Sequence, residues 1–135
     1  FGLWGQIYNA WTDPTGGAWV EDAAPNVLAW IHRMLYPTIE GDFESWASLE
    51  ATLMPFLRDQ VGELFCPWTV ANTAAMAAGE DEFSVELKGK TFTQQPQKYH
   101  AKSLAVLRER YAAAEGKPEL DRVLEASGCL AALRD

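Results

Sequence analysis

The chain opens with the stretch Phe1-Gly2-Leu3-Trp4-Gly5-Gln6-Ile7-Tyr8-Asn9-Ala10-Trp11. Its large apolar residues stand at positions 1, 4, 8 and 11, with Ile7 beside them. Spacing by three or four residues puts them on one face of a helix, so we expect Phe1, Trp4 and Tyr8 to face inward. No Ser, Thr or Asp precedes the stretch to cap the first amide groups. We therefore expect the helix to continue upstream, as in a C-terminal fragment of a longer protein, and the fragment to self-associate through the apolar surface left uncovered.

Helical spacing continues along most of the chain. Pro25 is suited to the first turn of a second helix, which Tyr36-Pro37 ends, and Trp30 is expected in the core. A third helix is expected from Ser45 or Ser48 to about residue 64, with a kink or restart at Pro55. Further helices are predicted from residue 69 to 79, from 99 to about 114, and around 120–124. Breaks are expected at 12–17, at 38–43 and at 67–69, where turn-forming residues or proline gather.

One segment has the alternation of a strand. Phe83, Val85 and Leu87 alternate with polar residues, and Lys88-Gly89 is a two-residue turn. Counting back from the turn pairs Leu87 with Lys90 and Val85 with Phe92. The sequence therefore predicts a single helical domain over residues 1–135, a mainly α helical bundle with a small β-hairpin insertion near residues 83–93.

Composition excludes several classes of protein. The 135 residues include 19 acidic and 11 basic ones, a net charge of −8, which disfavours a surface for nucleic acid or anionic membranes. No apolar run approaches the ~20 residues that span a bilayer, and no secretory signal pattern is present. Cys66 and Cys129 lie in apolar surroundings, as free buried cysteines do, although a disulfide between them stays open. The cysteine content favours a reducing cytoplasm.

Few residues suggest chemistry. No Gly-rich phosphate loop, GxSxG or HExxH motif occurs, and we predict no catalytic residue and no metal site. A cationic cluster near a helix start could hold an anionic ligand, the alternative being a solvated first turn. Two tryptophans flanked by polar or turn residues could line a cleft, although tryptophans more often belong to a core. The candidate binding residues are Trp46, Trp68, Lys98, Tyr99, His100 and Lys102.

Two segments at the start of the chain resemble a known family. The stretch Ala24-Pro25-Asn26-Val27-Leu28-Ala29-Trp30, followed by Arg33 and Met34, has the order proline, aliphatic pair, tryptophan, arginine and apolar residue. Phe1, Leu3 and Gly5 look like the continuation of a central helix that opens with a Ser/Thr-x-x-Asp capping motif. Residues 1–36 thus resemble the C-terminal helical domain of glutathione S-transferases. Residues 45–135 look like a C-terminal extension of some bacterial relatives.

The resemblance implies a division of labour between domains. Glutathione, the co-substrate, and the residue that activates its thiol would belong to a separate N-terminal thioredoxin-like domain, and no catalytic residue matches a position here. The chain would supply scaffold and the wall of an apolar substrate pocket, in a cytoplasmic dimer, and would be inactive alone. The alternatives are a stand-alone helical module that binds a small apolar or anionic ligand or a protein partner, and a structural domain without a ligand.

Overall fold

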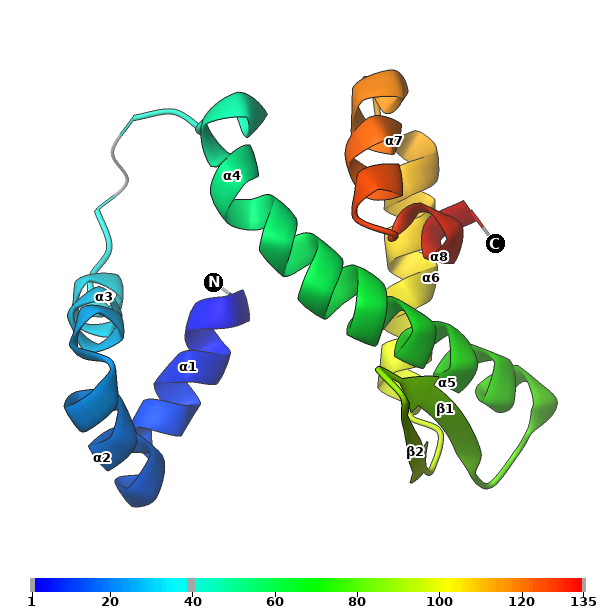
Figure 1. The fold of residues 1–135 in the computed structure, drawn as a ribbon, viewed down its shortest axis with the longest axis horizontal. Coiled ribbons are helices and arrows are strands. Elements are labelled where there is room, and N and C mark those ends of the chain that lie inside the picture. The colour runs from blue at the N-terminus through cyan, green and yellow to red at the C-terminus, as the bar shows by residue number, and fades with distance from the viewer. Residues whose placement is uncertain (1, 39–40, 135) are drawn as a thin grey trace. The chain divides into compact units, whose positions relative to one another are not determined.

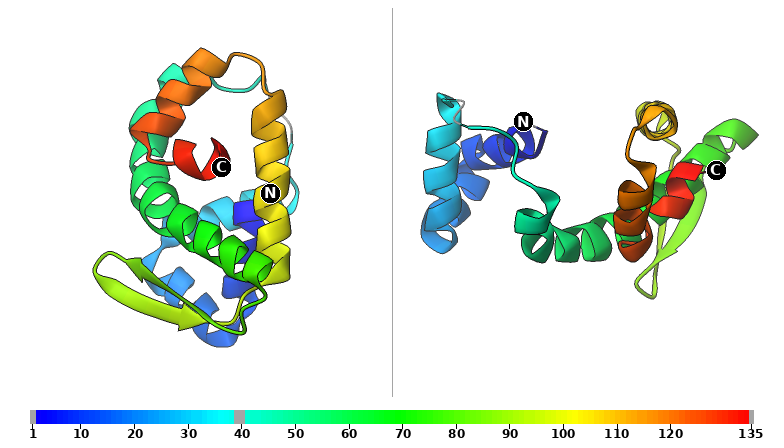
Figure 2. Two further views of the ribbon diagram at one scale, coloured as in Figure 1. Left: turned by 90° about the vertical axis from the view of Figure 1, so that its right-hand side faces the viewer. Right: turned by 90° about the horizontal axis from the view of Figure 1, so that it is seen from above.

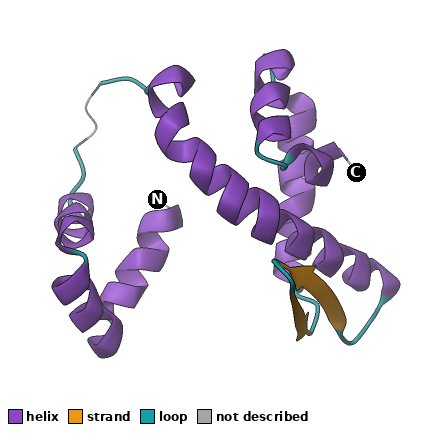
Figure 3. Ribbon diagram, in the orientation of Figure 1, coloured by secondary structure: helices purple, strands orange, loops and turns teal. Residues whose placement is uncertain are grey.

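The computed structural model describes residues 2–38 and 41–134, and these are mainly helical (Figures 1 and 3). They fall into two compact units, Phe1–Phe43 and Glu44–Asp135, each of which is considered by itself. The prediction of a mainly α chain with a small hairpin is confirmed. Within the described ranges, none of the helices has both the length and the apolar character required to cross a bilayer.

The first unit consists of α1 (Gly2–Thr12), α2 (Pro14–Ala23) and α3 (Pro25–Leu35), which pack against one another. The predicted first helix is confirmed, whereas Phe1 lies outside the described residues. Trp4 and Tyr8 are half-buried, and their rings stack with centroids 4.9 Å apart. The apolar stripe of α1 therefore faces inward only in part.

The break expected at residues 12–17 is wrong for most of its length. Only Asp13 separates the two helices, because α1 extends to Thr12 and α2 already begins at Pro14. The Asp13 carboxylate accepts hydrogen bonds from the backbone N–H groups of Thr15 at 2.9 Å and Gly16 at 2.8 Å. Asp and Pro favour turns, but in this order they also cap and begin a helix.

The helix α3 begins at Pro25 and ends before Tyr36, as predicted. Its buried residue is Ile31, which is 0% exposed, and the prediction that Trp30 lies in the core is wrong because Trp30 is only half-buried. A unit of three short helices has little interior, and the centre of the stripe occupies it. Trp11 of α1 meets His32 edge to face, with ring centroids 5.4 Å apart.

The second unit is built on one long run of helix (Figure 1). It comprises α4 (Trp46–Phe56), the π-helix η1 (Leu57–Phe65) and α5 (Cys66–Ala78). The hydroxyl of Ser45 caps α4, accepting from the backbone N–H of Ser48 at 3.3 Å. The chain stays helical through Pro55, and its hydrogen bonds widen from the α to the π pattern two residues later. Gly79, with φ +69°, ends α5 as expected.

The interruption predicted at residues 67–69 is wrong. Pro67 is the second residue of α5, and Thr69 is a buried residue inside that helix rather than its cap. A helix tolerates proline in its first turn, since the missing N–H is not needed there. The change from π to α hydrogen bonding at Cys66 creates such a first turn in the middle of a continuous helix.

The hairpin has the predicted register. Strands β1 (Phe83–Leu87) and β2 (Lys90–Gln94) are antiparallel, with Val85 opposite Phe92 and Leu87 opposite Lys90. Lys88 and Gly89 both adopt positive φ, 50° and 74°, as a tight turn of this kind requires. β1 packs on α5, so the hairpin is supported by a helix.

Three helices complete the unit: α6 (Lys98–Ala113), α7 (Lys117–Ala126) and the short α8 (Leu130–Arg134). The first two were predicted, α8 was not. The start of α6 is fixed to α5 by fully buried Asn72, whose amide exchanges two hydrogen bonds with the backbone of Gln97, at 2.7 and 3.1 Å. α8 packs on α5, α6 and α7 (Figure 2).

The corner between α7 and α8 packs against the π-helix. A Cβ atom on Gly62 would lie 1.9 Å from the carbonyl oxygen of Ser127, so only glycine allows this approach. Behind the contact is a buried cluster of Cys66, Cys129 and Ala132, against which Val61, Val70 and Leu124 pack. The widened π turn thus receives the corner that positions α8.

Candidate ligand-binding site

The structure brings together only part of the predicted binding residues. Trp68 of α5 meets His100 of α6 edge to face, with ring centroids 5.0 Å apart. Tyr99 and His100 are also in contact, at 6.2 Å. Trp46 is the first residue of α4, about 30 Å from Trp68 along the same helical run. The two tryptophans therefore do not line one cleft.

The predicted cationic cluster divides between two sides of α6. His100 is half-buried and faces inward against Trp68, whereas Lys98, Tyr99 and Lys102 are exposed. Trp68 also contacts buried Phe83 of the hairpin, at 6.1 Å. The His100 imidazole is thus part of an aromatic contact that joins α5, α6 and β1. Only the outer residues of the cluster are placed to meet a ligand.

Outward-facing residues of α6 form a pocket of about 570 Å³, which we call the α6 outer face. Helical spacing puts them on one side, since they recur along α6 at intervals of three or four residues. Tyr99 is 79% exposed, and Val106 and Leu107 are large apolar residues left open to solvent. The Ser103 hydroxyl donates a hydrogen bond to the backbone carbonyl of Tyr99, at 3.0 Å. The lining residues are Tyr99, Lys102, Ser103, Val106, Leu107 and Arg110.

Two cations frame this apolar strip. Lys102 and Arg110 are eight residues apart, about 12 Å along the helix, and Val106 and Leu107 lie between them. The ion pairs formed within the described ranges involve neither cation. Glu109 directly precedes Arg110, so the net positive charge of the α6 outer face is modest. A positive strip with an apolar centre matches an anion that carries an apolar body.

A second group of charged residues lies where α6, α7 and α8 meet. The Tyr111 hydroxyl donates to Asp121 at 2.8 Å, and the guanidinium of Arg134 donates to Asp121 at 2.7 Å and to Tyr111 at 3.2 Å. These contacts lower the pKa of Asp121, first through the Tyr111 hydrogen bond and then through Arg134. Arg108 donates to the carbonyl of Ala132 at 2.9 Å.

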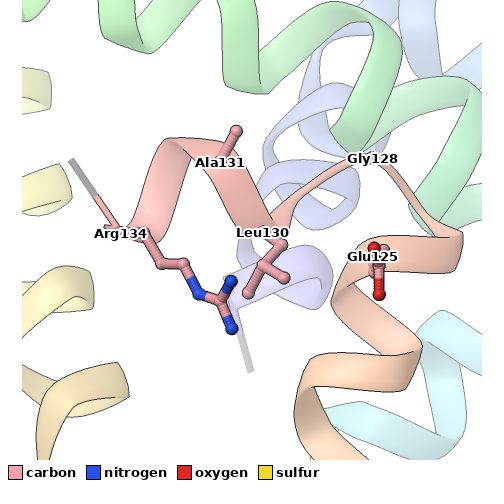
Figure 4. Close-up of a pocket in the computed structure, with 5 residues that line it drawn as sticks. All are labelled: Glu125, Gly128, Leu130, Ala131 and Arg134. Carbon is pink, nitrogen blue, oxygen red and sulfur yellow. The ribbon is translucent and has the colours of Figure 1, made fainter.

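These charged groups line a pocket of about 510 Å³ and hold α6, α7 and α8 together. Lys117 lies 4.6 Å above the Tyr111 ring. The three cations of this pocket, Arg108, Lys117 and Arg134, therefore all contact other groups of the protein. A neighbouring pocket of about 440 Å³ lies between the end of α7 and α8 (Figure 4). It combines Leu130 with the charged side chains of Glu125 and Arg134, which belong to different helices.

The sequence did not single out three residues of the α6 outer face, Val106, Leu107 and Arg110. Helical spacing places Val106 and Leu107 in or beside an apolar stripe, and the packing of α5 on α6 decides which residues of the helix face solvent. Among residues 2–38 and 41–134, no group of three or more His, Cys, Asp or Glu side chains could hold a metal ion.

Comparison with known proteins gives no relative. No protein family, no curated protein and no solved structure matches the chain.

Proposed function

We propose that this chain is the helical part of a cytoplasmic glutathione S-transferase-like protein, in which it supplies scaffold and an apolar wall while a thioredoxin-like domain binds glutathione. One observation supports the proposal: the stretch 24–34 that carries the resemblance forms a helix from Pro25 onward and buries Ile31 completely against its unit. In this proposal the chain itself holds no catalytic residue, and the parent protein self-associates.

Glutathione turnover tests the proposal. The chain alone and the complete protein encoded by its gene are each assayed with glutathione and an aryl halide. We expect the complete protein to conjugate the halide and the chain alone to stay at the uncatalysed rate. An encoded protein that lacks a thioredoxin-like domain, or a chain that turns over alone, would contradict the proposal.

The α6 outer face favours a second function, the binding of an amphipathic anion such as an aryl sulfonate or an alkyl carboxylate. Its volume is within the usual range for small-ligand sites, and Lys102 and Arg110 can meet the acid group at either end of the apolar strip. Antiparallel pairing of this face with a second copy would set Lys102 of one chain near Arg110 of the other. Like charges disfavour that use, so a negatively charged ligand fits the face better.

Fluorescence of anilinonaphthalene sulfonate, an aromatic anion, tests this function. We expect the double variant Lys102→Gln/Arg110→Gln to weaken binding about tenfold, and binding to weaken with added salt as charge pairing does. Lys90→Gln, which removes an exposed cation from the hairpin, is the matched control. Equal affinity of the double variant and the control for this anion would show that the α6 outer face is not its binding site.

A further inference from the structure

Cys66 and Cys129 come from distant parts of the chain and share one buried cluster. Cys66 is the first residue of α5, and Cys129 lies between α7 and α8. They are 9% and 4% exposed, and Ala132 completes the cluster. The fold therefore places two thiols side by side where α8 packs on the rest of its unit.

The two thiols are shielded from solvent while α8 is packed in place. The Cys129 thiol makes long contacts to backbone oxygens, 3.9 Å to Leu57 and 3.8 Å to Ser127. Burial raises the pKa of Cys66 to about 12, and the closeness of Cys129 adds to the rise. The Cys66 sulfur is thus protonated at neutral pH, and a protonated thiol is a poor nucleophile.

The same short helix controls access to both sulfurs. α8 has five residues and is held by its packing on α5, α6 and α7, by the hydrogen bond of Arg108 to the Ala132 carbonyl, and by the contacts of Arg134 with Asp121 and Tyr111. Short elements with few buried residues open locally at a small free energy. Opening of α8 would uncover Cys129 and also Cys66, because a pocket of about 270 Å³ connects Cys66 with Ala132.

We propose that Cys66 and Cys129 are a modification site that takes a reversible intramolecular disulfide, formed by exchange with a low-molecular-weight disulfide of the glutathione type. Cys129 loses its proton and attacks one sulfur of that disulfide, which releases one thiolate and leaves a mixed disulfide. Cys66 loses its proton and attacks the Cys129 sulfur, which releases the second thiolate. The protein gives up two protons and two electrons, and the small disulfide is reduced to two thiols. The site is independent of the glutathione S-transferase-like function.

Intact mass measurement tests the site. The purified chain is equilibrated with mixtures of reduced and oxidised glutathione and is then quenched with N-ethylmaleimide. In the oxidising mixtures we expect a monomer that has lost two hydrogens and takes no maleimide, with a peptide that links Cys66 to Cys129. Reduced glutathione should restore two maleimide adducts. A chain that keeps both thiols, or takes glutathione on each cysteine without linking them, in every mixture would overturn the proposal.

Two variants test the role of α8. Arg134→Ala removes its contacts without touching a sulfur and should speed oxidation several-fold, whereas Arg58→Ala, which breaks an exposed ion pair with Asp59, should leave the rate unchanged. Cys66→Ser and Cys129→Ser should each abolish the linked species. Equal oxidation rates in the wild type and Arg134→Ala would contradict access through α8. Because the mass of the wild-type chain reports the disulfide directly, failure of a variant to fold does not affect the test.

Discussion

Gly62 lies at the point where the π-helix touches the carbonyl oxygen of Ser127. A methyl group there would overlap a backbone atom that cannot swing aside, so Gly62→Ala must displace the α7–α8 corner. We expect a loss of about 1–3 kcal/mol in the free energy of unfolding, as for other overpacked sites. Denaturant titration followed by circular dichroism measures it.

Gly5 provides the matched control for Gly62. It is also a helical glycine, but a Cβ atom there would meet nothing within 4 Å. Gly5→Ala should therefore stabilise by about 0.5–1 kcal/mol, the ordinary gain in a helix. A Gly62→Ala variant as stable as the wild type would show that the close approach to Ser127 is not needed.

Asp121 makes the stability of the second unit depend on acid. Its pKa is lowered from 3.8 in the folded protein, mainly because Tyr111 and then Arg134 donate hydrogen bonds to the ionised carboxylate. A lowered folded pKa contributes stability that is complete above the unfolded value and is lost as the pH falls through the folded value. The difference in unfolding free energy between wild type and Asp121→Asn should thus be constant at neutral pH and shrink below about pH 4.

Thermal unfolding at several pH values measures this effect. Tyr111→Phe removes the larger donor, so in that background the contribution of Asp121 should be smaller and should disappear at a less acidic pH. A difference that stays constant down to pH 2 would mean that Asp121 is not stabilised in its ionised form.

Some single residues could not be assigned from the sequence. Asn72 looks like an ordinary polar helix residue, yet its side chain is 0% exposed because the backbone of Gln97 supplies both of its hydrogen-bond partners. Trp30 and Ile31 are neighbours in an apolar stripe, and periodicity cannot decide which of them a small unit encloses. Such choices depend on contacts from distant segments.

Among the elements, the hairpin turn contains a correctable strain. Lys88 has φ 50°, a conformation that costs most L-residues energy and that asparagine tolerates better. Lys88→Asn should therefore raise the unfolding free energy by about 0.5–1 kcal/mol. The ion pair of Lys88 with Glu63, 3.0 Å long and half exposed, contributes little against this gain.

Two further substitutions separate the effect of backbone strain at Lys88 from that of its ion pair with Glu63. Glu63→Gln should lower stability by less than about 1 kcal/mol, since exposed ion pairs rarely contribute more. Lys90→Asn, in the strand that follows the turn, should give no gain because the position needs no positive φ. A destabilised Lys88→Asn variant would show that the ion pair outweighs the backbone strain.

The elements were predictable where a local rule decides them. The hairpin register follows from alternation and a two-residue turn, and α6 and α7 follow from helical spacing. Proline misled the prediction at Pro14 and Pro67, because the same residue ends one helix and opens another. The five-residue α8 has too few residues to show a period, and its stability comes from the surfaces on which it packs.

At the scale of the whole molecule, the second unit contains its own buried cluster and hairpin. We expect residues 44–135 to fold alone, with a single cooperative transition in urea and nuclear Overhauser contacts between Val85 and Phe92. The complete chain serves as the reference for both measurements. A non-cooperative transition in the shorter chain would mean that residues 1–43 are required for its folding.

The candidate site was predictable in its residue types but not in its grouping. The cluster of polar and cationic residues at the start of α6 predicts Tyr99 and Lys102, and both line the α6 outer face. His100 and Trp68 face each other inside, and Trp46 is at the far end of the long helix. Which side of α6 is covered depends on α5, a segment whose packing no local pattern reports.

The nine residues of the π-helix also act as a phase shift in the long helix. An α-helix turns by about 100° per residue, so a wider turn rotates everything that follows it. The buried residues of α5, among them Asn72 and Ala75, are aimed correctly only after this rotation. If the same nine residues adopted α geometry, that face would turn away from α6 and the hairpin. The hydrogen-bond pattern of this segment therefore determines where α5 packs.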